Sequence, residues 1–134
     1  MDRGASSMIL GIGVDTVDIE RFALWDTYSE KKLSRIFSAD EIAYCLENKN
    51  KSGERFAVRF AAREALYKTL CNAYPNNKLP FLTVCAHTTI KKVEGRPYVE
   101  LRTIADIDVG ALIIHLSLSH SRTQATAFVV LEKK

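Results

Sequence analysis

Apolar and polar residues alternate near the end of the chain, and this period of two predicts β-strands. In Ile113–Ser119 the even-numbered positions are apolar, while positions 115, 117 and 119 are polar. Ala125–Glu132 reads as a further strand whose most apolar part is residues 129–131. The short polar segment His120–Gln124 between them suits a hairpin turn.

An apolar run at the start of the chain predicts another strand over Met8–Val14. Gly11 and Gly13 interrupt this run, which is typical of a place where another backbone or a ligand approaches closely. Leu82–Ile90 and Tyr98–Arg102 are also expected to be strands, joined through the turn at residues 94–97.

The middle of the chain has helical patterns. Glu54–Cys71 is rich in Ala, Arg, Glu and Leu, and its aromatic residues form an apolar stripe, so it is the strongest helix. Ser38 and Glu41 form a capping box that starts a helix from Ala39 to about Asn48. Shorter helices are expected over Ile19–Tyr28 and Glu30–Ile36. A strand, then helices, then mostly strands predicts an α+β domain and not alternating βαβ units.

Composition limits the class of protein. The chain has 134 residues, of which 47% are hydrophobic, as expected for one small globular domain. Its formal net charge of +3 suits an anionic ligand or an acidic protein partner, and is far from the strongly basic character of a nucleic-acid binder. The mild charge leads us to expect no nucleic-acid partner. No apolar run reaches transmembrane length, so we expect no membrane partner either.

The cysteines and the N-terminus indicate a cytoplasmic protein. Cys45, Cys71 and Cys85 are odd in number and widely spaced, which argues against a disulfide framework or a zinc site and favours reduced thiols. Met1–Ser7 has no apolar stretch, so it is not a signal peptide. We interpret residues 1–7 as a tag or extension and residues 8–134 as the domain.

Carboxylates at two places could bind a metal ion. Asp15 directly follows the first strand, where an exposed carboxylate suits Mg²⁺, although a turn or cap role is the commoner explanation for such a residue. Glu64 and Lys68 are spaced i, i+4 on the strong helix and share one face. This is most often a surface ion pair, but a carboxylate for metal beside an ammonium for phosphate is also what phosphoryl transfer requires.

One polar loop could bind an anion. His120 ends a strand and is flanked by Ser119, Ser121 and Arg122, which together offer hydroxyl, imidazole and guanidinium donors. An ordinary polar hairpin loop is the competing explanation. None of these local signals is decisive alone.

In their order along the chain, these segments resemble one family. Ile9–Phe22 resembles the opening G-I-G-x-D-x-x-x-I-x-R motif of the bacterial holo-[acyl-carrier-protein] synthases, which are 4′-phosphopantetheinyl transferases. Arg59–Lys68 resembles their R-F-A-x-K-E-A-x-x-K helix, and residues 92–97 resemble their G-[KR]-P turn. Leu116–His120, followed by Ala125–Glu132, resembles their S-[IL]-S-H and A-x-A-x-V strand pair. The matching segments cover about a third of the chain, and they occur in the family's order and spacing.

The resemblance implies a fold, an assembly and a metal site. It implies a phosphopantetheinyl-transferase-like α+β domain with an antiparallel sheet and a long helix, assembled as a homotrimer with active sites between subunits. Mg²⁺ would be held by Asp15 and Glu64 together with the pyrophosphate of coenzyme A, and Lys68 would contact a phosphate. His120 would come from the neighbouring subunit, and Arg21 would dock acidic acyl carrier protein. The expected catalytic residues are Asp15, Glu64, Lys68 and His120, and the expected coenzyme contacts are Arg59, Arg63, Lys68, Gly95, Arg96, Pro97, Ser119 and His120.

The implied reaction transfers 4′-phosphopantetheine from coenzyme A to a serine of apo acyl carrier protein and releases adenosine 3′,5′-bisphosphate, as a step in fatty acid biosynthesis. Either Glu64 or a water on the metal could accept the serine proton. The chain departs from the family at two places. Arg63 replaces a usual lysine, and residues 69–73 lack the glycine of a loop that lines the coenzyme pocket.

Two other functions fit parts of the pattern. A non-enzymatic basic module could bind nucleic acid or an acidic protein through Arg21, Arg63 and Lys68. The clustered carboxylates at Asp15, Asp18 and Glu64 speak against nucleic acid, since they would repel phosphate without a metal. A metal-dependent phosphodiesterase would use water in place of the serine, and hydrolysis of coenzyme A without a carrier protein would identify it.

Overall fold

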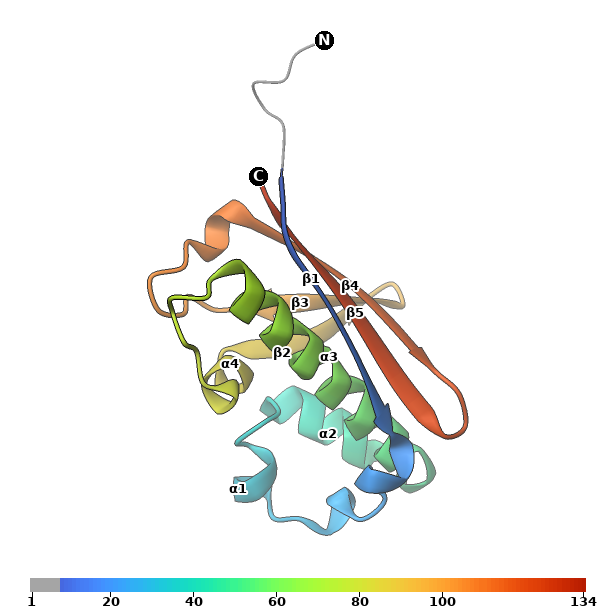
Figure 1. Ribbon diagram of the computed structural model, residues 1–134. Helices are drawn as coiled ribbons and strands as arrows, with labels where there is room; N and C mark the ends of the chain where they lie inside the picture. Colours follow the sequence, from blue (N-terminus) through green and yellow to red (C-terminus); the bar gives the residue numbers. More distant parts are fainter. Residues whose placement is uncertain (1–7) are drawn as a thin grey trace.

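The fold consists of one long helix packed across a three-stranded antiparallel sheet (Figure 1). The computed structural model describes residues 8–134, so the expected extension at residues 1–7 lies outside the described residues. The sheet has the order β1–β5–β4, formed by Met8–Asp18, Gln124–Lys133 and Leu112–His120. The helix is α3, Ser52–Ala73. The other elements are α1 (Glu30–Leu33), α2 (Ala39–Glu47), α4 (Phe81–Ala86), and the two-stranded sheet of β2 (Thr88–Val93) and β3 (Arg96–Leu101).

The central strand β5 supplies the middle of the core. Its alternate residues Ala125, Ala127, Val129 and Leu131 are fully buried on the face that packs against α3. β4 and β5 form the hairpin that the alternating pattern predicts, and β1 pairs with the other edge of β5. The sheet is therefore built from segments at both ends of the described chain.

Glycines allow β1 to lie very close to α3. A Cβ atom built at Gly13 would overlap the Thr69 hydroxyl and the Ala65 carbonyl oxygen, and one at Gly11 would lie 3.0 Å from the Thr69 carbonyl oxygen. Ala61, Ala62 and Ala65 keep the buried side of the helix equally small. The interruptions of the first apolar run therefore mark a close approach of two backbones.

Helix boundaries agree with the sequence where capping and helix propensity are strong. The predicted capping box is present at α2, since Ser38 Oγ accepts from the Glu41 N–H at 3.3 Å and the Glu41 carboxylate accepts from the Ser38 N–H at 3.2 Å. The helix expected over Ile19–Tyr28 is instead two short 3₁₀ turns, Ile19–Phe22 and Trp25–Thr27.

The strand prediction for Leu82–Ile90 is wrong over its first half. Residues 81–86 form helix α4, and only Thr88–Val93 is a strand. Phe81, Val84 and Cys85 have the i, i+3, i+4 spacing of a helix face, and Val84 and Cys85 are buried. The Phe81 ring packs 5.7 Å from the Phe60 ring, so contacts with α3 select the helix for this short apolar run.

Two of the three cysteines are buried. Cys45, Cys71 and Cys85 are all free, as their spacing predicts. Burial raises the pKa of Cys45 and of Cys85 to about 12, so these two thiols stay protonated at neutral pH.

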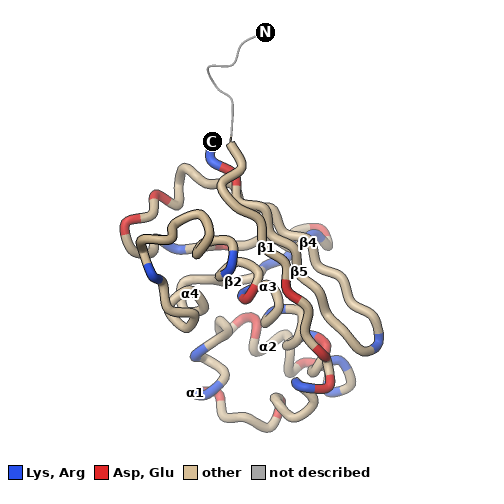
Figure 2. The backbone as a smooth tube through the Cα atoms, viewed as in Figure 1, with Lys and Arg blue, Asp and Glu red and all other residues tan. Residues whose placement is uncertain are grey.

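The outer face of the three-stranded sheet exposes large apolar side chains among polar ones. Ile12, Val14 and Phe128 are 52%, 53% and 42% exposed, and Val14 is opposite Phe128 in the β1–β5 register. Ile113 of β4 is 37% exposed on the same sheet. Figure 2 shows long uncharged stretches along β1, β4 and β5. Within residues 8–134, no helix has the length and apolar character needed to cross a membrane.

We expect Gly13→Ala to lower the free energy of unfolding by about 1–3 kcal/mol, because the added methyl group overpacks the contact between β1 and α3. Chemical denaturation of the purified protein would measure this change. Gly53→Ala is the matched control. Its Cβ would make ordinary van der Waals contacts, 3.5 Å from the Phe22 carbonyl oxygen and 3.7 Å from the Ala23 Cα atom, and alanine favours the helix, so stability should be unchanged or higher. Equal stability of both variants would contradict the close approach.

Candidate active site

The first group of predicted site residues meets where β1 passes α3. Lys68 Nζ donates a hydrogen bond to Asp15 Oδ1 at 2.8 Å and a second to the Val14 carbonyl oxygen at 3.2 Å. The Asp15 side chain is only 14% exposed, whereas that of Lys68 is 48% exposed. The packing of β1 against α3 thus brings together two residues that are 53 positions apart in the sequence.

Glu64 belongs to the same group. The pKa of its carboxyl is raised, first by burial and then by the negative charge of Asp15, while Lys68 and Arg21 oppose the rise. Two carboxylates and two cations therefore act on one another at this place. Arg21 is exposed, and its guanidinium lies 4.9 Å from the centroid of the Phe60 ring.

The donor set at this place fits magnesium. Mg²⁺ prefers hard oxygen ligands and commonly uses one or two carboxylates together with substrate phosphates and water. Asp15 and Glu64 supply such carboxylates, and residues 8–134 contain no group of three or more His, Cys, Asp or Glu side chains arranged to hold a metal ion. The site would therefore need oxygen ligands from a substrate to complete it.

A second group of predicted residues lines a pocket of about 250 Å³. Arg59, Gly95, Pro97 and His120 all contribute to its wall. The pocket lies between the N-terminal half of α3, the end of α2, the β2–β3 turn and the end of β4. Gly95 takes a positive φ of 78° in that turn, which glycine adopts without strain.

The charge of the pocket wall suits an anion. Lys51, Arg55, Arg59 and Lys92 line it beside the single carboxylate of Glu54. His120 is half-exposed, and its Nδ1 lies 3.5 Å from Glu54 Oε1. Sequence reasoning missed Lys51, Arg55 and Lys92, and the i, i+4, i+8 spacing of Arg55, Arg59 and Arg63 was the signal that could have found one of them.

Two predicted coenzyme contacts lie outside this pocket wall. Ser119 and Arg96 are exposed, next in sequence to His120 and Gly95. Because successive residues of a strand point to opposite faces, Ser119 lies on the outer face of the sheet.

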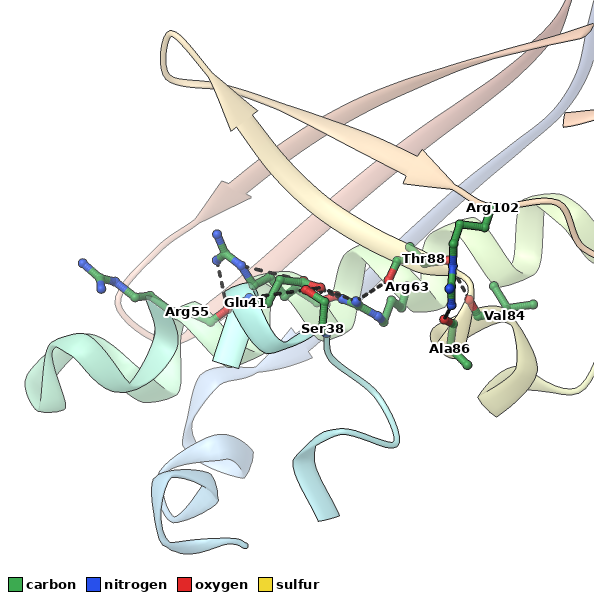
Figure 3. Close-up of polar contacts among 9 residues, drawn as sticks. Ser38, Glu41, Arg55, Arg63, Val84, Ala86, Thr88 and Arg102 are labelled. Atoms are coloured by element: carbon green, nitrogen blue, oxygen red, sulfur yellow. Dashed lines mark hydrogen bonds and ion pairs between the residues drawn. The ribbon is translucent and has the colours of Figure 1, made fainter. Parts of the chain in front are cut away.

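The remaining predicted residue, Arg63, is in the core. It is fully buried and forms a bidentate ion pair with Glu41 of α2, with one nitrogen 2.8 Å from Glu41 Oε2 (Figure 3). It also donates to the Thr88 carbonyl oxygen at 2.8 Å. Arg63 thereby joins α3, α2 and β2. It does not line the pocket, and it contacts the second group through the Arg59 carbonyl oxygen, to which it donates at 3.5 Å.

The two groups lie on different flanks of α3. Arg59 and Arg63 point toward α2, where they meet Glu41, whereas Lys68 points toward β1, where it meets Asp15. With 3.6 residues per turn, Glu64 is about 140° away from Arg59 around the helix axis, a little more than a third of a turn. One chain therefore carries the carboxylate group beside β1 and the basic pocket beside β4, at the two edges of the same sheet.

Comparisons with known proteins agree on one family. The model of the 4′-phosphopantetheinyl transferase superfamily matches residues 11–129. The holo-[acyl-carrier-protein] synthase of Treponema denticola is 37% identical over 93% of this chain and 99% of its own length, and that of Clostridium tetani is 38% identical over 93% and 97%. A crystal structure of the Bacillus anthracis holo-(acyl-carrier-protein) synthase in complex with CoA (3′,5′-ADP) superposes with a TM-score of 0.73, at 30% identity over 95% of this chain and 99% of that one.

We expect Glu41→Gln and Arg63→Met each to lower the free energy of unfolding by about 3–5 kcal/mol, because each leaves a buried group without its partner. The double variant should lose much less than the sum, since it removes both charges. Denaturant titrations of the four proteins would give the coupling free energy.

The exposed pair of Lys91 and Glu100, 3.0 Å apart, is the control for this cycle. Lys91→Met should cost less than about 1 kcal/mol. Additive losses at Glu41 and Arg63 would contradict the buried pair.

Proposed function

Because the chain belongs to the holo-[acyl-carrier-protein] synthases of the 4′-phosphopantetheinyl transferase superfamily, we propose that it transfers 4′-phosphopantetheine from coenzyme A to a serine of apo acyl carrier protein. In this proposal the reaction depends on Mg²⁺ and releases adenosine 3′,5′-bisphosphate. The observation that carries it is the convergence of Asp15, Glu64 and Lys68 where β1 crosses α3. Two carboxylates for a metal and an ammonium for a phosphate are what this chemistry needs.

Asp15 and Glu64 would hold the metal ion, which as a Lewis acid would polarise the phosphoryl oxygens when bound. Lys68 is placed to stabilise the same developing negative charge, since its ammonium already lies within hydrogen-bond distance of Asp15. The new bond joins the serine oxygen to the phosphorus that carries the pantetheine arm. The bond to the bisphosphate oxygen breaks, and the serine proton passes to Glu64 or to a water molecule in the site.

The basic pocket would bind the nucleotide part of coenzyme A. Its wall carries four Lys or Arg side chains beside one Glu, and Gly95 and Pro97 shape its rim. His120 is on this wall and is well placed to contact a phosphate. Arg63 supports the pocket indirectly, because it fixes α2 against α3.

We propose that the active sites are completed between subunits of a homotrimer. Two features support this arrangement. The carboxylate group and the basic pocket lie at opposite edges of one sheet, and the outer face between those edges exposes Ile12, Val14 and Phe128. A head-to-tail contact that joins one edge to the opposite edge of the next copy forms a ring of three when each copy is rotated by a third of a turn relative to the last.

Arg21 is the proposed contact for the acidic carrier protein. Its guanidinium is exposed, stacks on the Phe60 and Phe22 rings, and acts electrostatically on Glu64. A carrier that docks at Arg21 would therefore arrive beside the carboxylate group. The free thiols at all three cysteines fit a reducing compartment, and we infer that the reaction takes place in the cytoplasm.

We expect intact-protein mass spectrometry of apo acyl carrier protein, incubated with this chain, coenzyme A and Mg²⁺, to show a gain of one phosphopantetheine. EDTA should abolish the gain. Asp15→Ala and Glu64→Ala should each reduce turnover by about 100-fold or more, because each removes a metal ligand.

Asp18→Asn is the matched control on the same strand, since Asp18 is exposed and its carboxylate accepts a hydrogen bond from the Gln124 side-chain amide at 3.2 Å. Near-normal turnover in both alanine variants would overturn the metal assignment. Hydrolysis of coenzyme A in the absence of carrier would favour the phosphodiesterase, and salt-sensitive nucleic-acid binding that survives EDTA would favour the binding module.

Complementation between two inactive chains would test the shared site. One chain would carry Glu64→Ala, and the other His120→Ala with Lys92→Ala. When they are co-expressed with different tags and purified through both, only mixed trimers remain, and each should have one intact junction, which restores about a third of the sites. Activity no greater than that of the separate variants, in confirmed mixed oligomers, would show that each chain holds a whole site.

A further inference from the structure

The ring of Tyr44, on α2, is surrounded by three cations of the basic pocket. The Arg55 guanidinium carbon lies 3.9 Å from the ring centroid, that of Arg59 lies at 4.6 Å, and the Lys92 ammonium nitrogen lies at 5.7 Å. These residues come from α3 and β2, and all of them, with Tyr44, line the pocket. Each cation is within the range of a cation–π interaction.

This cluster carries more positive than negative charge, although Glu54 lines the same pocket and Asp40 lines the adjoining one. Three cations beside one ring repel one another, and the quadrupole of the ring attracts them without neutralising them. The nearby carboxylate of Glu41 is engaged by the fully buried Arg63, and its closest approach to Arg59 Nε is 3.9 Å. Arg59 is 6% exposed and its Nε has no hydrogen-bond partner. The cluster is thus prepared for an anion that supplies both charge and acceptors.

Tyr44 also fixes how its cations are placed. Arg55 donates to the Tyr44 carbonyl oxygen at 2.7 Å, so the backbone of α2 holds one guanidinium while the ring holds the others. Lys92 belongs to the strand that leads into the Gly95 turn. The ring therefore links β2 to α3 along the pocket wall.

We propose that Tyr44 is a positioning residue that holds Arg55, Arg59 and Lys92 as a preformed receptor for a phosphomonoester of the nucleotide substrate. This inference rests on the proposed function. Coenzyme A has two anionic parts, a pyrophosphate and a ribose 3′-phosphate. If Asp15 and Glu64 hold a metal for the pyrophosphate, the separate cation cluster has the charge and the donors for the 3′-phosphate.

The test compares coenzyme A with dephospho-coenzyme A, which lacks the 3′-phosphate, on the full chain and its Tyr44→Leu and Tyr44→Phe variants. Tyr44→Leu should weaken calorimetric binding of coenzyme A and raise its KM by about tenfold, with kcat unchanged. Its affinity for dephospho-coenzyme A should change less than twofold. Tyr44→Phe keeps the ring and should behave like the native chain with both ligands.

Equal loss with the two ligands, a loss in kcat, or the same loss in Tyr44→Phe would overturn the inference. Thermal unfolding would verify that Tyr44→Leu is folded. If Tyr44→Leu does not fold, Lys92→Met provides the test, because Lys92 is an exposed residue of the same cluster. This variant should reduce the preference for coenzyme A over dephospho-coenzyme A, and an unchanged preference would overturn the inference.

Binding and turnover separate this inference from the proposed reaction. Glu64→Ala should lose turnover and keep the preference for coenzyme A over dephospho-coenzyme A. A native chain that transfers phosphopantetheine but binds both ligands equally would refute the role of Tyr44. A native chain that prefers coenzyme A but transfers nothing to a carrier would refute the proposed reaction and leave the receptor intact.

Discussion

The close contact between β1 and α3 is the constraint on which the rest of the structure depends. Because Gly11 and Gly13 have no side chains, the strand lies against the helix backbone near Thr69 and Ala65. That approach brings Asp15 to Lys68 and Glu64, and it turns the opposite face of β1 outward. The contact between β1 and α3 therefore both assembles the carboxylate group and leaves large apolar side chains exposed on the outer face of the sheet.

The other flank of α3 depends on charge instead of small size. Arg63 and Glu41 neutralise each other in the core, while Arg59 and Arg55, one and two turns earlier, reach a pocket where carboxylates are few. Of these three arginines on α3, Arg63 therefore stabilises the core, while Arg59 and Arg55 line the pocket. α2 contributes to both, with Glu41 in the core and Tyr44, less than one turn later, at the pocket.

The sequence predicts the fold class, the long helix, the hairpin and the capping box, because each depends on local pattern. It fails over residues 81–86, where contacts with Phe60 decide between helix and strand for a short apolar run. The motif residues Asp15, Glu64 and Lys68 could be listed in advance and do come together. The burial of Arg63 and the place of Tyr44 could not be foreseen, because both depend on how α2 packs against α3.

The position of the two residue groups at opposite edges of one sheet has a consequence for the amount of protein in a cell. Under the proposed assembly, an isolated subunit has both halves of a site but cannot bring them together. Catalytic capacity would then rise more steeply than the number of chains, because association follows mass action. Output would remain low while the protein is scarce and would increase sharply once its concentration passes the dissociation constant of the ring.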